Sequence, residues 1–112
     1  MLPEDRLDST FEFVQYLGVI RSFGSKETES IWLGFPVRAF SLEVQKVARR
    51  KLRVLNNVRT LAELRVPPGN RLEPLKGDRK GQFSIRVNDQ YRICFHWHET
   101  DCHEVELVDY HG

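Results

Sequence analysis

The hydrophobic period of the chain changes between residues 58 and 82, and this change limits the folds that the chain can adopt. From Ser41 to Val58, apolar residues recur at helical spacing, and Ser41 is a good N-cap residue. From residue 82 onward, apolar and polar residues alternate, which is the pattern of β-strands with one buried face. The sequence therefore predicts a long helix followed by consecutive strands, with Pro67–Asn70 as a loop between them.

The remaining elements complete an α+β pattern. Three strands are predicted in the second half, at residues 82–87, 91–97 and 105–110, with turns at 88–89 and 98–102. The first half holds a predicted strand at 19–23, a short helix at 27–33 closed by Gly34, and a helical turn at 60–64. We expect the helices to pack on one face of the sheet. The opposite face is expected to present four residues to solvent: Ser84, Arg86, Arg92 and His96.

The composition is that of one soluble globular domain. The chain has 112 residues, 40% apolar and 29% charged, and is long enough to bury a core without a disulfide or a metal. No apolar run approaches the roughly 18–20 residues that cross a membrane, and the acidic N-terminus lacks the layout of a signal peptide. Two cysteines are too few for a disulfide scaffold and indicate a reducing, cytoplasmic setting.

The net charge of +1 conceals a strong segregation of charge. Residues 38–92 contain 14 basic and 5 acidic residues, for a local charge of +9, whereas residues 93–112 contain 5 acids and neither Lys nor Arg. A compact region with such an excess of cations favours an anionic partner. The acids of the C-terminal segment are expected to lie apart from the cationic face.

Cations gather around the predicted hairpin. Arg86 and Arg92 flank its turn and are expected to lie close across it. Three further cations come shortly before it, near glycines that permit tight turns: Lys76, Arg79 and Lys80. Such a cluster favours phosphate binding, and the alternative is a surface charged for solubility. The basic side of the helix at 41–58 leaves similar alternatives open, a solvated face or a docking surface for RNA or an acidic protein.

The chain ends with residues suited to acid–base chemistry, Asp109, Tyr110 and His111. The unperturbed pKa of histidine, about 6.5, suits proton transfer near neutral pH. RNA cleavage needs a base for the ribose 2′-OH, cations for the charged phosphorane and an acid for the leaving 5′-oxygen, and an aromatic ring can stack on a base. The alternative is that His111 is an ordinary terminal residue.

Other chemistries are disfavoured by spacing. Five residues invite a metal interpretation but do not match a zinc template: Cys94, His96, His98, Cys102 and His103. The sequence also lacks a phosphate-binding glycine loop and a G-x-S-x-G motif. We therefore expect neither a metal nor a cofactor.

Three stretches of the sequence resemble the HigB toxins of bacterial toxin–antitoxin modules. They are VIRSF (residues 19–23), PGNRLEPLKGDRKGQFSIRVNDQYRICF (68–95) and VELVDYH (105–111). They occur in order, so residues 19–112 are interpreted as a toxin domain and residues 1–18 as an N-terminal extension. HigB toxins belong to the RelE-like superfamily, and the resemblance implies two helices on a four- or five-stranded, mainly antiparallel sheet.

The resemblance also implies an activity and partners. The expected activity is that of an endoribonuclease which cleaves translated mRNA in the A site of the 70S ribosome, in the bacterial cytoplasm. The expected partner is a HigA-like helix-turn-helix antitoxin, and operator DNA would be contacted only through that antitoxin. No membrane partner is expected.

Site residues follow from the resemblance by position. Lys76 and Arg92 match cations near the scissile phosphate, and Asp109, Tyr110 and His111 match the C-terminal catalytic cluster. The residues expected to bind RNA are Arg71, Arg79, Lys80 and Arg86.

One departure from the family pattern keeps alternatives open. Glu73 stands where some HigB toxins have a histidine before the Pro-Leu-Lys run, so the general base is His111 or, as a second choice, Glu73. A weakened toxin that acts mainly as an antitoxin-binding co-repressor is one alternative function. Another is a same-fold toxin without RNase chemistry, such as the ParE-type inhibitors of DNA gyrase, because a fold does not fix a function.

Overall fold

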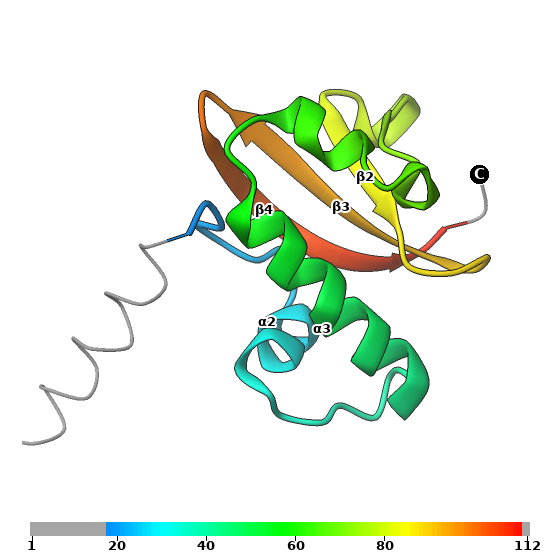
Figure 1. Cartoon of the computed structure of the whole chain (residues 1–112). Helices are drawn as coiled ribbons and strands as arrows, with labels where there is room; N and C mark the ends of the chain where they lie inside the picture. The colour runs from blue at the N-terminus through cyan, green and yellow to red at the C-terminus, as the bar shows by residue number, and fades with distance from the viewer. Residues whose placement is uncertain (1–17, 111–112) are drawn as a thin grey trace, which may run out of the picture.

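The computed structural model describes residues 18–110. The predictions made for residues 1–17 and for His111 lie outside this part of the chain, and the assignment of residues 1–18 as an extension stays a prediction. In Figure 1, the first half of the described chain contains the helices and the second half forms the sheet. The helices are α2 (Lys26–Leu33) and α3 (Leu42–Asn57), and the strands are β1 (Glu73–Pro74), β2 (Gln82–Arg86), β3 (Tyr91–His98) and β4 (Asp101–Asp109).

Both helices begin at a serine N-cap, and α2 ends at a glycine. The Ser25 side chain accepts from the Thr28 amide at the start of α2, and the Ser41 side chain accepts from the Val44 amide at the start of α3. Gly34 closes α2 with a left-handed backbone, φ 92°, which glycine adopts without steric cost. The predicted helices at 27–33 and 41–58 are thus confirmed to within a residue or two.

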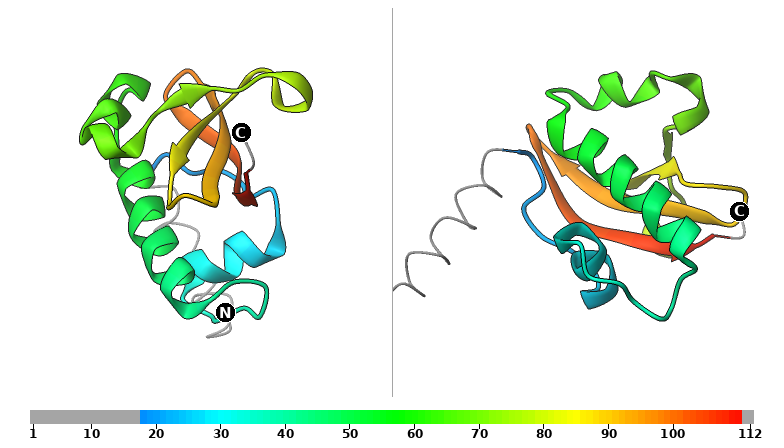
Figure 2. Two further views of the ribbon diagram at one scale, coloured as in Figure 1. Left: turned by 90° about the vertical axis from the view of Figure 1, so that its right-hand side faces the viewer. Right: turned by 60° about the horizontal axis from the view of Figure 1, so that its bottom comes forward.

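The sheet is antiparallel with the strand order β1-β2-β3-β4. Figure 2 shows both helices on the same side of it. Apolar side chains from both layers meet in one core, formed among others by Ile31, Leu52, Leu55, Ile85, Ile93, Phe95 and Val105. The predicted α+β arrangement, with two helices on one face of a four-stranded antiparallel sheet, is confirmed.

Two elements at the edges differ from the prediction. Residues 19–23 do not form a full strand and pair with β4 only through parallel bridges from Ile20 to Cys102 and from Phe23 to Val105. The turn predicted at 98–102 is shorter, because His98 pairs with Asp101 and β4 begins there. Backbone pairing with residues 19–23 on its far side holds this first part of β4 in the sheet.

The second face of the sheet is covered, where the alternation predicted a solvated surface. Ser84 and Cys94 are fully buried and Arg92 is 8% exposed. The segment that follows Asn70 returns across this face: the Arg71 carbonyl accepts from Arg92, and Arg79 reaches Glu106 of β4. The prediction that Ser84 and Arg92 face solvent is therefore wrong, whereas Arg86 and His96, the other two residues predicted on this face, are partly exposed.

Residues 18–110 contain three short 3₁₀ turns, two between α3 and β1 and one between β1 and β2. They are η1 (Leu61–Arg65), η2 (Pro68–Asn70) and η3 (Gly77–Arg79). The helical turn predicted at 60–64 corresponds to η1, and the predicted loop at 67–70 contains η2. Gly77 and Gly81 have φ 63° and 97°, which confirms the tight turns expected around them. Within residues 18–110, no helix is long and apolar enough to cross a membrane.

Candidate functional site

A basic hollow lies where the β2–β3 turn meets the end of β4. It has a volume of about 240 Å³, and we refer to it as the arginine hollow; its lining residues are Arg71, Arg86, Asn88, Asp89, Arg92 and Tyr110. The Tyr110 amide donates to the Gln90 carbonyl at 2.8 Å, which joins the end of β4 to the turn. Four of the residues predicted from the sequence, Arg71, Arg86, Arg92 and Tyr110, are therefore brought together.

Arg92 is the most firmly held side chain of the arginine hollow. Its Nε donates to Ser84 Oγ at 2.6 Å, and its Nη2 donates to the carbonyl oxygens of Arg71 and Ser84. A buried guanidinium needs hydrogen-bond acceptors for its N–H groups, and these bonds supply them for Nε and Nη2. The result is a cation whose orientation is fixed before any ligand arrives.

Glu73 and Tyr110 contact the same guanidinium. The β1–β2 pairing places Glu73 opposite Ser84, and Glu73 Oε1 lies 3.7 Å from Arg92 Nη2. The Tyr110 ring centroid is 5.7 Å from Arg92 Cζ, within the range of a cation–π contact. Both residues thus stand beside the cation predicted to face the scissile phosphate, although Glu73 does not line the hollow itself.

Arg86 and Arg92 are direct neighbours across β2 and β3, as the sequence predicts. Like charges at directly opposed positions repel each other. The two guanidinium groups find different partners, because Arg86 pairs with Asp89, whose side chain is 99% exposed. An anion between the two arginines would relieve their repulsion, so the geometry favours binding of a phosphate.

The other predicted cations do not join this hollow. Arg79 pairs with Glu106 at 3.4 Å and donates to Gln82 at 3.1 Å. Lys76 and Lys80, at either end of η3, are exposed, and within residues 18–110 their side chains form no hydrogen bond or ion pair. The expected single cluster is thus divided, and the pairing of Glu106 with Arg79 contradicts the expectation that the C-terminal acids lie apart from the cations.

The C-terminal group is only partly brought to the hollow. Tyr110 lines it, whereas Asp109 pairs across the sheet with Tyr91 and its carboxylate accepts from Gln90 at 3.1 Å. The predicted base, His111, lies outside the described residues.

Lys51 was missed as a residue near this site. It extends from α3, and its Nζ donates to Asn70 Oδ1, immediately before Arg71 in the chain. Burial lowers the pKa of Lys51 below its ordinary value, and the charges of Arg50 and Arg86 lower it further. A signal was present in the sequence, because Lys51 lies three residues after Ala48 and four before Leu55, beside the buried stripe.

Neither cysteine is prepared for nucleophilic chemistry. Both are free and fully buried. Burial raises the pKa of both thiols, and at Cys94 it outweighs the opposing effect of Arg79 and Arg92. Within the part of the chain that the structure describes, no three His, Cys, Asp or Glu side chains come together as a metal site.

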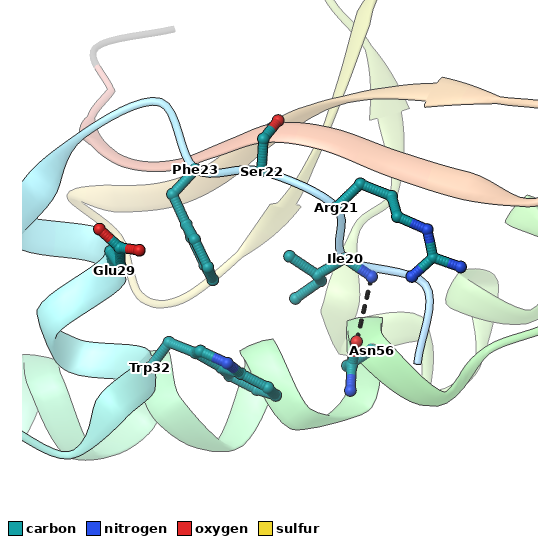
Figure 3. Close-up of a pocket in the computed structure, with 7 residues that line it drawn as sticks. All are labelled: Ile20, Arg21, Ser22, Phe23, Glu29, Trp32 and Asn56. Atoms are coloured by element: carbon teal, nitrogen blue, oxygen red, sulfur yellow. Dashed lines mark hydrogen bonds between the residues drawn. The ribbon is translucent and has the colours of Figure 1, made fainter. Parts of the chain in front are cut away.

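A second hollow, of about 260 Å³, lies between the first described residues and the helices. Figure 3 shows Phe23 and Trp32 turned toward each other across it, with ring centroids 6.3 Å apart, and the Ile20 amide donating to Asn56 Oδ1 at 3.0 Å. Arg21 on its rim pairs with Asp101 at 3.2 Å. None of the residues predicted to be functional lines this hollow.

The fold and the arginine hollow together define a small α+β protein with three arginines gathered at one end of its sheet. Residues 37–111 match the family described as RelE-like toxin of type II toxin–antitoxin system HigB, and the chain belongs to this family.

Individual relatives are similar over shorter stretches. Toxin HigB-1 of Vibrio cholerae is 45% identical over 60 residues, which are 54% of this chain and 63% of that protein. Endoribonuclease HigB of Proteus vulgaris is 44% identical over 41 residues, which are 37% of this chain and 45% of that protein. The chain thus spans less than two thirds of the length of these relatives. A more distant likeness is to a chain of the YoeB–YefM complex from Staphylococcus aureus, with a TM-score of 0.48 and 14% identity over 83% of this chain and 98% of that chain.

Proposed function

We propose that the protein is the toxin of a type II toxin–antitoxin module and acts as a ribosome-dependent endoribonuclease on translated mRNA. The observation that carries this proposal is the arginine hollow, in which Arg71, Arg86 and Arg92 converge beside the Tyr110 ring. Fixed cationic donors at a concave site suit the phosphate that gains charge during RNA cleavage. Membership of the HigB family supports the same activity.

In the proposed reaction, a base takes the proton of the ribose 2′-OH and the oxygen attacks the adjacent phosphorus. The bond to the 5′-oxygen breaks, and an acid returns a proton to that leaving oxygen. Arg92, held by Ser84 and the Arg71 carbonyl, stabilises the charged phosphorane, and Arg86 and Arg71 hold the phosphate backbone. Tyr110 stacks on a base, and Lys76, Arg79 and Lys80 contact RNA beyond the hollow.

Two groups remain candidates for the base. His111 is the first, since it follows Tyr110 and Asp109 in the chain. Glu73 is the second, with a half-exposed carboxylate 3.7 Å from the Arg92 guanidinium. A base so close to the cation that faces the phosphate would be well placed to reach a neighbouring 2′-OH.

The proposal includes the partners of such a toxin. The substrate is mRNA in the A site of the 70S ribosome, which places the activity in the bacterial cytoplasm. A HigA-like helix-turn-helix antitoxin binds the toxin and carries the contact with operator DNA.

A purified translation system with a reporter mRNA tests the activity by primer extension. Wild-type protein is expected to cut the message only when ribosomes translate it. His111→Ala is expected to lower the cleavage rate by about 10²–10⁴-fold, the usual contribution of one acid–base group to the rate. Arg86→Ala is expected to weaken cleavage without loss of the fold. Intact mRNA together with inhibited gyrase supercoiling would refute the proposal and favour the ParE-like alternative.

A further inference from the structure

Asn70 is a buried polar residue at the junction between α3 and the arginine hollow. It is 1% exposed. Its Nδ2 donates to the carbonyl oxygens of Leu64 and Val66, both at 3.2 Å, and its Oδ1 accepts from Lys51 Nζ. One side chain thus ties η1, η2 and α3 together, and buried amides of this kind fix a backbone in one conformation.

The next residue depends on this anchor. Arg71 has a left-handed backbone, φ 47° and ψ 54°, which is unfavourable for any residue with a side chain and persists only where neighbouring bonds impose it. Its amide donates to the Pro68 carbonyl at 3.0 Å, and its own carbonyl accepts from Arg92 Nη2. The same backbone position therefore orients both the Arg71 side chain and the Arg92 guanidinium.

Lys51 completes a chain of contacts from the helix to the site. Its ammonium group donates to Asn70 Oδ1. Two nearby cations repel its charge: Arg50 on its own helix and Arg86 in the arginine hollow. Lys51 is partly buried, which costs its charged form hydration, and the bond to Asn70 Oδ1 offsets part of that cost.

We infer that Lys51 and Asn70 are a positioning pair for the arginine hollow, which holds the turn before Arg71 so that its carbonyl fixes the Arg92 guanidinium. Neither residue needs to touch RNA. This inference rests on the proposed function only in its kinetic consequence, since a misplacement of about 1 Å at a catalytic group can cost up to about 10²-fold in rate.

The test compares Lys51→Met, which keeps length but removes the donor, with Lys51→Arg, which keeps a cationic donor. Lys46→Met is the matched control, because Lys46 is exposed on the same helix and its removal changes the net charge equally. In the translation assay, Lys51→Met is expected to lower kcat by on the order of 10-fold with KM changed less than about threefold. Lys51→Arg is expected to restore most of kcat, and Lys46→Met to leave kcat unchanged.

A second measurement does not depend on cleavage. The Nε–H signal of Arg92 in an NMR spectrum of arginine side chains is expected to shift or broaden in Lys51→Met but not in Lys46→Met. Signals of core amides such as that of Ile93 should stay in place, which reports an intact fold. If Lys51→Met fails to fold, Asn70→Asp, which keeps the oxygen but loses both donors to the turn, is expected to disturb the Arg92 signal likewise.

Three outcomes would overturn the inference. They are an unchanged Arg92 signal in folded Lys51→Met or Asn70→Asp, wild-type kcat in Lys51→Met, and a rise in KM alone, which would show that Lys51 acts through its charge. If the wild-type protein fails to cut mRNA, the proposed function fails, whereas the NMR comparison still decides on the positioning pair.

Discussion

Arg86 and Arg92, which face each other across β2 and β3, should differ sharply in their contributions to the free energy of unfolding. Arg92 is buried and bonded to Ser84 Oγ at 2.6 Å and to the Arg71 carbonyl, and it lies 3.7 Å from Glu73. Arg86 pairs with a fully solvated Asp89. Replacement of either by alanine removes the same charge and the same donors from adjacent positions, so each variant is the control for the other.

The expected magnitudes follow from burial. Arg92→Ala leaves the buried Ser84 hydroxyl and the part-buried Arg71 carbonyl without their charged donor, at about 1.5–3 kcal/mol for each bond, and such losses are not additive. We expect a loss of about 3 kcal/mol in the free energy of unfolding, which corresponds to roughly 12–24 °C in Tm for a domain of this size. Arg86→Ala breaks an exposed ion pair and should cost less than about 1 kcal/mol.

Urea unfolding followed by tryptophan fluorescence, with thermal melts by circular dichroism, measures both variants under identical conditions. The urea midpoint of Arg92→Ala should fall well below that of Arg86→Ala, while the slopes of the two transitions stay equal. If the two variants unfold within about 1 kcal/mol of each other, the guanidinium of Arg92 is not anchored as described, and the argument for a fixed cation in the hollow fails.

Three further predictions concern the scaffold. Leu52→Ala, at a fully buried position of α3, should lower the free energy of unfolding in urea by about 2–5 kcal/mol, and a loss below about 1 kcal/mol would contradict the assigned core. Gly34→Ala should cost about 1 kcal/mol in thermal melts, because φ is 92° although the site has room for a methyl group, and an unchanged Tm would refute the left-handed cap. Burial raises the pKa of Cys102, so the unfolded thiol ionises above pH 9.0 while the folded thiol stays protonated. The free energy of unfolding of the wild type, relative to that of Cys102→Ala, should therefore fall as pH rises beyond 9.0. A difference that does not change with pH would exclude this linkage.

Much of the architecture could be predicted because it depends on local pattern. The N-cap at Ser41 and the closing Gly34 need only the chemistry of neighbouring residues. The pairing of Arg86 with Arg92 follows from the hairpin register, which the short turn between β2 and β3 determines. The predictions of a strand at 19–23 and of the start of β4 were less accurate, because both features depend on partners distant in the chain.

The candidate site was predictable in composition but not in arrangement. The sequence singled out Arg71, Arg86, Arg92 and Tyr110, and the structure brings them together. It also named Lys76, Arg79 and Lys80, which lie elsewhere, because the direction of a loop side chain depends on how the loop crosses the sheet. Lys51 was overlooked, because a charge beside a buried helical stripe has the same local pattern whether or not a turn packs against it.

The sequence alone determined the elements, their order and the cations available for an anion site, because hydrophobic period, caps and turns act over a few residues. Only the tertiary structure decided which of these cations are held in place. The return of the segment after Asn70 across the second sheet face buries Arg92 and gives it Ser84 and the Arg71 carbonyl as partners. Burial and bonding between distant residues are properties of the packed chain, and they turn a charged strand residue into a fixed cation.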